Sequence, residues 1–155
     1  MTFHVLVGFV LPWLVGVFFI KKASKTMLLV FAVTAFLALL FNDIGAYAKW
    51  WEMTPHEMES ITTIPYSLGV YPIILTLMYR YVLPRIHPVW FVLLTALVLT
   101  LFESALVLSR RIEYHDGWNV GWTYVSYVLS VSIVFIYARL LLKAFGIPKS
   151  EVSSK

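Results

Sequence analysis

The sequence predicts an all-α fold, a bundle of about five helices that cross a membrane. Two observations carry the prediction: 61% of the 155 residues are hydrophobic while 13% are charged, and the apolar residues gather in long runs. Soluble domains are typically about 45–50% apolar and about 25% charged. The net charge of +4 comes from basic residues scattered between the apolar runs, with no basic helix of the kind that binds nucleic acid. The composition therefore favours a membrane protein over a soluble domain, a disordered chain or a nucleic-acid-binding module.

Five apolar segments are long enough to cross a bilayer, which takes about 17–25 residues for about 30 Å of hydrocarbon. They cover residues 3–20, 27–47, 64–82, 88–108 and 120–142. The linkers between them are too short for a soluble domain. We therefore expect one transmembrane domain over residues 1–145 and a cytoplasmic tail over residues 146–155.

The basic residues predict how the bundle is oriented, because short cytoplasmic loops are enriched in Lys and Arg. With the N-terminus outside and the C-terminus inside, nine of the 12 basic residues lie on the inner side. The other three are Lys49, Arg110 and Arg111. The sequence thus predicts a multi-pass protein of the cell membrane, N-out and C-in, surrounded by the lipid bilayer.

Two acidic residues fall inside predicted spans, near their outer ends. Asp43 lies four residues before the end of the second span, and Glu103 lies five before the end of the fourth. Both are thus about 6–8 Å below the boundary, where an ionised carboxylate that faces lipid is costly. We therefore expect both side chains to face the bundle interior, and they are the candidate catalytic residues should the protein be an enzyme.

Polar residues from other spans lie at a similar depth and complete a predicted outer layer. The candidate ligand-binding residues are Asn42, Asp43, Tyr66, Ser67, Glu103, Tyr124 and Ser126, with Ser104 and Thr123 beside them. One alternative is that the Ser, Thr and Asn side chains only hydrogen-bond between helices. A further alternative for Glu103 is a pair with Arg110, nearly two turns along the same helix face.

The third span contains two prolines. Pro65 is expected in the first turn of its helix, whereas Pro72 falls inside the span and leaves the carbonyl of Leu68 without its helical partner. This predicts a kink at Pro72, which either packs simply or opens a pocket.

Tryptophans gather at the predicted outer boundary. They are Trp50, Trp51, Trp118 and Trp122. An interfacial aromatic belt is the expected role, and a lid over the acidic layer is the alternative.

The sequence lacks the common motifs of metal and nucleotide chemistry. It contains no Cys, which excludes disulfides and Cys-ligated metals. His56-Glu57 does not begin a zincin motif, because Ser60 occupies the position of the second His. There is no Gly-rich phosphate loop and no nucleophile elbow. We therefore expect neither a metal nor a cofactor.

Several short patterns carry a resemblance to a known family. They are Asn42-Asp43-Ile44-Gly45, Lys49-Trp50-Trp51-Glu52, Ile64-Pro65 with Tyr71-Pro72, Glu103, and Tyr114-His115 with Gly117-Trp118-Asn119. With them the chain resembles, over most of its length, a family of small, functionally uncharacterised multi-spanning membrane proteins best known from endospore-forming bacteria. The resemblance implies the architecture and no activity. A looser similarity is to membrane lycopene cyclases, in which acidic residues closely follow a Pro, whereas Tyr66 and Ser67 follow Pro65 here.

Three functional hypotheses follow from the predicted layer. The leading one is a non-enzymatic membrane protein that binds a small or lipid-like ligand, a partner membrane protein or a second copy of itself. The second is a membrane-embedded acid catalyst, in which Glu103 or Asp43 protonates an apolar substrate and aromatic rings stabilise a cation. The third is a small proton-coupled carrier that uses the same carboxylates as a relay.

Overall fold

A computed structural model describes residues 1–20, 25–56 and 59–144. Its helices are α1 (Thr2–Val5), the π-helical segment η1 (Leu6–Val10), α2 (Leu11–Ile20), α3 (Lys25–Tyr47), α4 (Glu59–Leu68), α5 (Val70–Tyr81), the short 3₁₀ helix η3 (Leu83–Arg85), α6 (Pro88–Leu108) and α7 (Val120–Ala144). The chain is 82% helical, which confirms the all-α prediction. The predicted tail over residues 146–155 lies outside the described residues.

Four helical segments of the described chain are long and apolar enough to cross a membrane. They are Met27–Tyr47, Ile61–Arg85, Pro88–Leu108 and Val120–Leu141. Three of them match predicted spans closely, and the remaining one begins before the predicted residue 64. The first apolar segment, Thr2–Phe18, is shorter than the other four. The fold class is therefore confirmed, with four long candidate spans and one shorter apolar segment in place of the five predicted spans.

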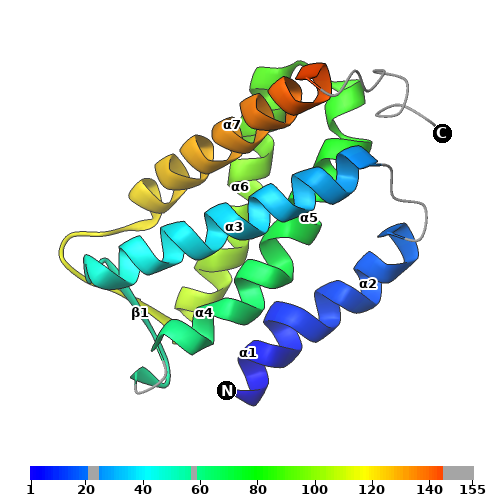
Figure 1. Ribbon diagram of the computed structural model, residues 1–155. Helices are drawn as coiled ribbons and strands as arrows, with labels where there is room; N and C mark the ends of the chain where they lie inside the picture. The colour runs from blue at the N-terminus through cyan, green and yellow to red at the C-terminus, as the bar shows by residue number, and fades with distance from the viewer. Residues whose placement is uncertain (21–24, 57–58, 145–155) are drawn as a thin grey trace.

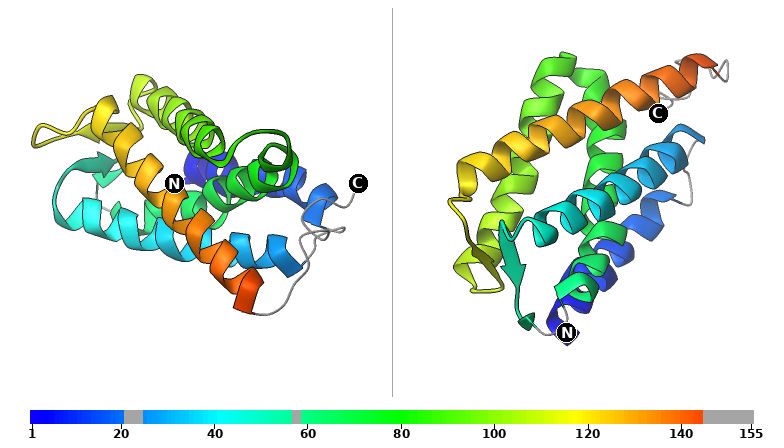
Figure 2. Two further views of the ribbon diagram at one scale, coloured as in Figure 1. Left: turned by 90° about the horizontal axis from the view of Figure 1, so that it is seen from above. Right: turned by 60° about the vertical axis from the view of Figure 1, so that its left-hand side comes forward.

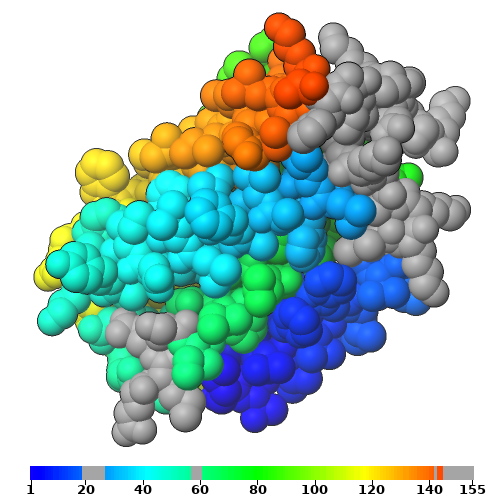
Figure 3. Space-filling model, in the orientation of Figure 1, coloured from blue at the N-terminus to red at the C-terminus, as the bar shows by residue number. Residues whose placement is uncertain are grey.

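The helices run along one another as a bundle (Figures 1 and 2), and α3 lies beside both α7 and α4 on the face shown in Figure 3. The N-terminus and the C-terminal end of α7 lie at opposite ends of this bundle. The chain passes along the bundle an odd number of times, through α1–α2, α3, α4–α5, α6 and α7, so its two ends come out on opposite sides. The orientation relative to the two sides of a membrane stays a prediction.

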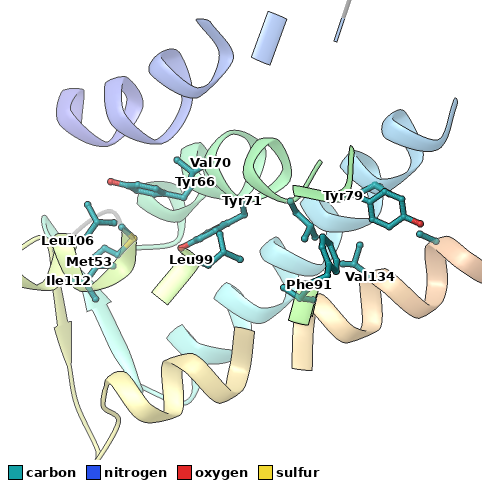
Figure 4. Close-up of a cluster of buried hydrophobic side chains, with 14 residues drawn as sticks. Met53, Tyr66, Val70, Tyr71, Tyr79, Phe91, Leu99, Leu106, Ile112 and Val134 are labelled. Carbon is teal, nitrogen blue, oxygen red and sulfur yellow. The ribbon is translucent and has the colours of Figure 1, made fainter. Parts of the chain in front are cut away.

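The central rod is the one formed by α4 and α5. Two thirds of its apolar window (67%) is buried, against 22% for α3 and for α7. Its tyrosines Tyr66, Tyr71 and Tyr79 are all buried and contribute to the apolar core drawn in Figure 4. The surrounding helices instead expose large apolar side chains such as Phe18 and Leu108, as expected of helices that face lipid.

The break in the central rod lies at Gly69, three residues before the predicted kink. Pro72 occupies the first turn of α5, where a missing N–H is tolerated. The prediction for Pro65 is wrong: because α4 begins at Glu59, Pro65 lies inside that helix. Pro72 has no N–H to donate to the carbonyl of Leu68. That carbonyl instead accepts a hydrogen bond of 3.1 Å from Nε1 of Trp13 on α2.

The first helical segment crosses the central rod at this break. A Cβ atom on Gly69 would lie 2.0 Å from the carbonyl oxygen of Gly8, so only glycine allows the two backbones to approach so closely. Nearby, the buried His4 hydrogen-bonds the hydroxyl of Tyr66 at 2.8 Å, and its Nε2 donates to the carbonyl of Thr54 at 2.6 Å. The α1–α2 segment is thus attached to the central rod at its first residues and at its middle.

Two linkers pair as a small antiparallel sheet, which the sequence did not predict. Strand β1 (Trp51–Met53) pairs with β2 (Ile112–Tyr114), and Trp51 lies opposite Tyr114. A hydrogen bond from the amide of His115 to the carbonyl of Trp50 extends the pairing. We call the end of the bundle that carries β1 and β2 the sheet end. The sheet joins the α3–α4 linker to the α6–α7 linker.

Candidate functional site

The site centres on the carboxyl group of Glu103, which is buried at the sheet end of α6. Three hydroxyl groups donate to it. Those of Tyr114 and Thr123 reach Oε1 at 2.8 and 3.2 Å, and that of Tyr127 reaches Oε2 at 2.5 Å. Hydrogen bonds of this number satisfy most of the acceptor positions of a carboxylate. Glu103 therefore faces the bundle interior, as the sequence predicted.

The start of α7 places two of these hydroxyls. Asn119 caps the helix, because its Oδ1 accepts hydrogen bonds from the amides of Gly121 and Trp122. Thr123 and Tyr127 follow at a spacing of four residues, which puts both side chains on one face of α7. Thr123 also accepts a hydrogen bond of 2.9 Å from Nε1 of Trp118.

The third hydroxyl comes from the sheet. Tyr114 is the last residue of β2 and lies half-buried above Glu103. Burial, and next the neighbouring Glu103 carboxyl, raise the pKa of the Tyr114 hydroxyl above its ordinary value of 10.0. This phenol therefore stays protonated and able to donate at every physiological pH.

The pairing of Glu103 with Arg110 is not formed. Among the described residues no basic side chain makes an ion pair with Glu103, and Arg110 is exposed in the turn after α6, with a φ of 55°. The helix ends at Leu108, so the heptad spacing that would bring the two side chains to one face does not continue to Arg110.

Asp43 does not join Glu103, and the expectation of two carboxylates in one buried layer is wrong. Its side chain is exposed, whereas Asn42, the preceding residue, lines the interior beside Glu103. Consecutive helical residues point about 100° apart, and on α3 this rotation carries Asp43 away from the interior face that Asn42 reaches. This part of α3 does lie at the level of Glu103, but the side chain of Asp43 points outward and not inward as predicted.

Of the other predicted ligand-binding residues, all but Tyr124 lie at or next to the space beside Glu103. Asn42 donates to the hydroxyl of Ser67 at 2.8 Å, and Ser126 lines the space beside Glu103. Tyr66 contributes its ring to this space, while its hydroxyl bonds His4. Tyr124 turns away, since its hydroxyl donates to the carbonyl of Leu93 on α6.

Two small cavities flank Glu103. The first, of about 10 Å³, lies between the carboxyl and Tyr66, and the second, of about 40 Å³, lies toward Ser126 and Ser130 on α7. Both are lined by Asn42 and Tyr71 as well as Glu103. A space of this size holds on the order of one to three waters.

A larger groove of about 400 Å³ opens on the surface between α3 and α7. Its walls include Phe41 from α3 and Val125 and Leu129 from α7, and Asp116 lies at its mouth. Four residues line both the groove and the 40 Å³ cavity: Phe41, Trp51, Trp118 and Ser126. The groove therefore ends against the wall behind which Glu103 lies.

Tryptophans form much of that wall. The ring of Trp118 stacks on Trp50 at a centroid distance of 4.6 Å and contacts Trp51 at 5.1 Å. Trp122, which is 56% exposed, lies at 6.5 Å from Trp118 on the groove side. The cluster separates the groove from the buried carboxyl, as the predicted lid would, while Trp122 is exposed as a belt residue would be.

Sequence reasoning missed two hydrogen-bond partners of Glu103, Tyr114 and Tyr127. The spacing of Thr123 and Tyr127 on one helical face was a usable signal for Tyr127. Nothing local marked Tyr114, because it reaches Glu103 only through the pairing of two linkers distant in the sequence.

A second polar group lies on the surface of the sheet end. The carboxylate of Glu52 is 3.2 Å from Nδ1 of His56 and 3.8 Å from Nε2 of His115. Within the described residues, no group of three or more His, Cys, Asp or Glu side chains has the arrangement of a metal site.

Comparison with known proteins adds no family to this description: no family model, no curated protein and no solved structure matches the chain.

Proposed function

We propose that the protein is a multi-pass protein of the cell membrane that binds a small or lipid-like ligand in the groove between α3 and α7. The observation that carries the proposal is the shared wall between this groove and the Glu103 cavity. An apolar surface groove that ends beside a few convergent polar groups is the usual form of a ligand site. Membership of the endospore-former family is likewise a proposal, and the helical architecture is in keeping with it.

The position of the groove favours a ligand that arrives from the bilayer. Trp122, Val125 and Leu129 line it along one face of α7, and each is more than half exposed. If α7 spans the membrane, this face contacts lipid rather than water. An amphiphile would then enter sideways, with its apolar part between the helices and its polar end toward Glu103.

The proposal is tested by filling the groove. The probe is a brominated twelve-carbon alcohol, because bromine quenches tryptophan fluorescence on contact and three tryptophans besides Trp122 line the groove or its wall. In phosphatidylcholine nanodiscs the wild type should show saturable quenching. Val125→Phe should weaken binding at least about tenfold, which corresponds to about 1.4 kcal/mol.

Ile136→Phe is the matched control, because Ile136 lies on the same helix with similar exposure but does not line the groove. This variant should bind the probe like the wild type. Quenching that never saturates, or that falls equally in both variants, would show that the alcohol only partitions into the lipid and would refute the proposed site.

The two alternative functions depend on Glu103 as a proton donor. Its carboxyl beside the rings of Tyr71 and Tyr127 is the observation that favours acid catalysis, since aromatic faces stabilise cations. Catalysis would require turnover of a groove-bound apolar substrate that Glu103→Gln abolishes. A carrier would require proton uptake coupled to substrate movement in proteoliposomes, and the same variant would abolish that coupling.

A further inference from the structure

Resting on the proposed function, we infer that the groove takes a single-chain amphiphile whose polar end is a primary ammonium group, with Glu103 as its counter-ion. The chain of the amphiphile would lie against Phe41, Val125 and Leu129, and the ammonium group would reach the 40 Å³ cavity by crossing the lining that the two spaces share. Three independent properties of the site support this ligand class: its charge, its hydrogen-bonding groups and its size.

The charge of the site is entirely acidic. Among the described residues that line the groove and the two cavities, the charged ones are Glu103 at the inner end and Asp116 at the mouth. A buried carboxylate without a cationic partner is costly, and an ammonium ligand supplies that partner. A ligand with a carboxylate or phosphate group would meet like charge at both ends of the site.

The hydrogen-bonding groups of the cavity are mostly acceptors. The hydroxyl protons of Ser126 and Ser130 are donated to backbone carbonyls at 2.8 Å. The proton of Tyr127 points to Glu103, that of Thr123 to Glu103 or to the Tyr114 hydroxyl, and the Tyr71 hydroxyl is bonded to that of Tyr127. The indole of Trp118 is bonded to Thr123, and the amide nitrogen of Asn42 to Ser67. What remains for a ligand is chiefly the oxygen lone pairs of Ser126, Ser130, Asn42 and Glu103. An ammonium group has three donors and no acceptor, so it complements this wall.

The size of the cavity selects among ammonium groups. About 40 Å³, the space of a few waters at most, readily admits a primary ammonium group, which is close to one water molecule in size. A trimethylammonium group is larger by three methyls and would require Trp51 or Trp118 to move. The rings of Trp118 and Tyr127 line the same space and add favourable cation–π contacts.

The experiment compares twelve-carbon amphiphiles that differ only in the polar end. Native mass spectrometry of protein released from phosphatidylcholine nanodiscs counts bound dodecylammonium, dodecyltrimethylammonium, dodecanol and dodecanoate. We expect one dodecylammonium per chain, bound at least about tenfold more tightly than any of the other three. Glu103→Gln should reduce its affinity to that of dodecanol. Asp43→Asn is the matched control, because it removes the same charge from an exposed side chain at similar depth and should leave the preference unchanged.

The outcomes separate this inference from the proposed function. Equal binding of the alcohol, the carboxylate and the ammonium compound would refute the ligand class and leave the groove as a binding site. Absence of saturable binding for all four would refute both. A Glu103→Gln variant that folds and keeps the preference for ammonium would show that Glu103 is not the counter-ion. Should Glu103→Gln fail to fold, Ser126→Phe adds a bulky ring where the groove and the 40 Å³ cavity share their lining, while leaving the carboxyl in place. Retained dodecylammonium binding in that variant would equally refute the inference.

Discussion

Glu103 is a buried acidic residue whose carboxyl group depends on its hydrogen-bond donors. Its carboxyl accepts hydrogen bonds from Tyr114, Thr123 and Tyr127, and no cation among the described residues is paired with it. Removing one donor from a buried charged acceptor costs more than the hydrogen bond itself contributes, because the acceptor is left desolvated and unsatisfied. The hydroxyls should therefore be coupled energetically to Glu103.

Tyr127→Phe measures this coupling. The substitution removes one hydroxyl and should lower the free energy of unfolding by about 1–3 kcal/mol. In a Glu103→Gln background the loss should be smaller, since the neutral amide accepts less strongly. Unfolding in mixed micelles, followed by circular dichroism, gives the four values of the cycle. Tyr137→Phe, on the exposed face of α7, is the control and should change stability little. Additive losses from Tyr127→Phe and Glu103→Gln would contradict the coupling.

The sequence predicted the surroundings of Glu103 only in part, for a reason that single residues make clear. Position along a span sets the level of a residue in the bundle, and Asn42, Ser67 and Ser126 do lie near the level of Glu103. Rotation about the helix axis did not follow, because α3 is apolar nearly all round and gives no polar face to orient it. Asp43 was therefore placed on the wrong side.

At the scale of elements, the broken central rod depends on a contact from another helix. The sequence showed that Pro72 would leave the carbonyl of Leu68 without a helical donor, but it could not show that Trp13 on α2 would supply one. Nor could it place the break at Gly69, which is set by the close crossing of Gly8. Local signals mark where a helix is weak, and the packing of neighbours decides where it breaks.

This contact predicts a specific rescue. Trp13→Phe keeps most of the ring volume but removes the donor to Leu68, and it should destabilise the protein by about 1–3 kcal/mol. Pro72→Ala provides an amide N–H that can reach the same carbonyl. The loss from Trp13→Phe should therefore shrink in the Pro72→Ala background, as measured by thermal unfolding in detergent. An undiminished loss in the double variant would show that packing of the indole ring, and not its N–H, is what matters.

For the whole molecule, the composition and the long apolar runs were sufficient to predict a helical bundle, and four described helices have the length and composition to span a membrane. The pairing of β1 with β2 was beyond reach, because it joins three-residue segments some 60 positions apart and no turn links them directly. The bounds of the third span also shifted, since α4 tolerates Pro65 in its interior.

The orientation of the bundle can be tested directly because the chain has no Cys. Glu113 is exposed on β2 at the sheet end, and Arg85 is exposed after α5 at the opposite end. Glu113→Cys should react with an impermeant maleimide added outside intact cells, whereas Arg85→Cys should react only after the membrane is opened. The reverse pattern would invert the predicted N-out, C-in topology, and labelling of both from outside would show that the bundle does not span.

Because β1 and β2 are paired, separation of the two strands would change the surroundings of Glu103 in two ways at once. Trp51 on β1 belongs to the wall of the cavity, and its partner Tyr114 on β2 holds the carboxyl of Glu103. Unzipping the strands would therefore admit water to the acid and remove its phenol donor at once. Amide hydrogen exchange across the strand pair should accordingly report how often the buried acid becomes hydrated, and a bound amphiphile that bridges wall and acid should slow that exchange.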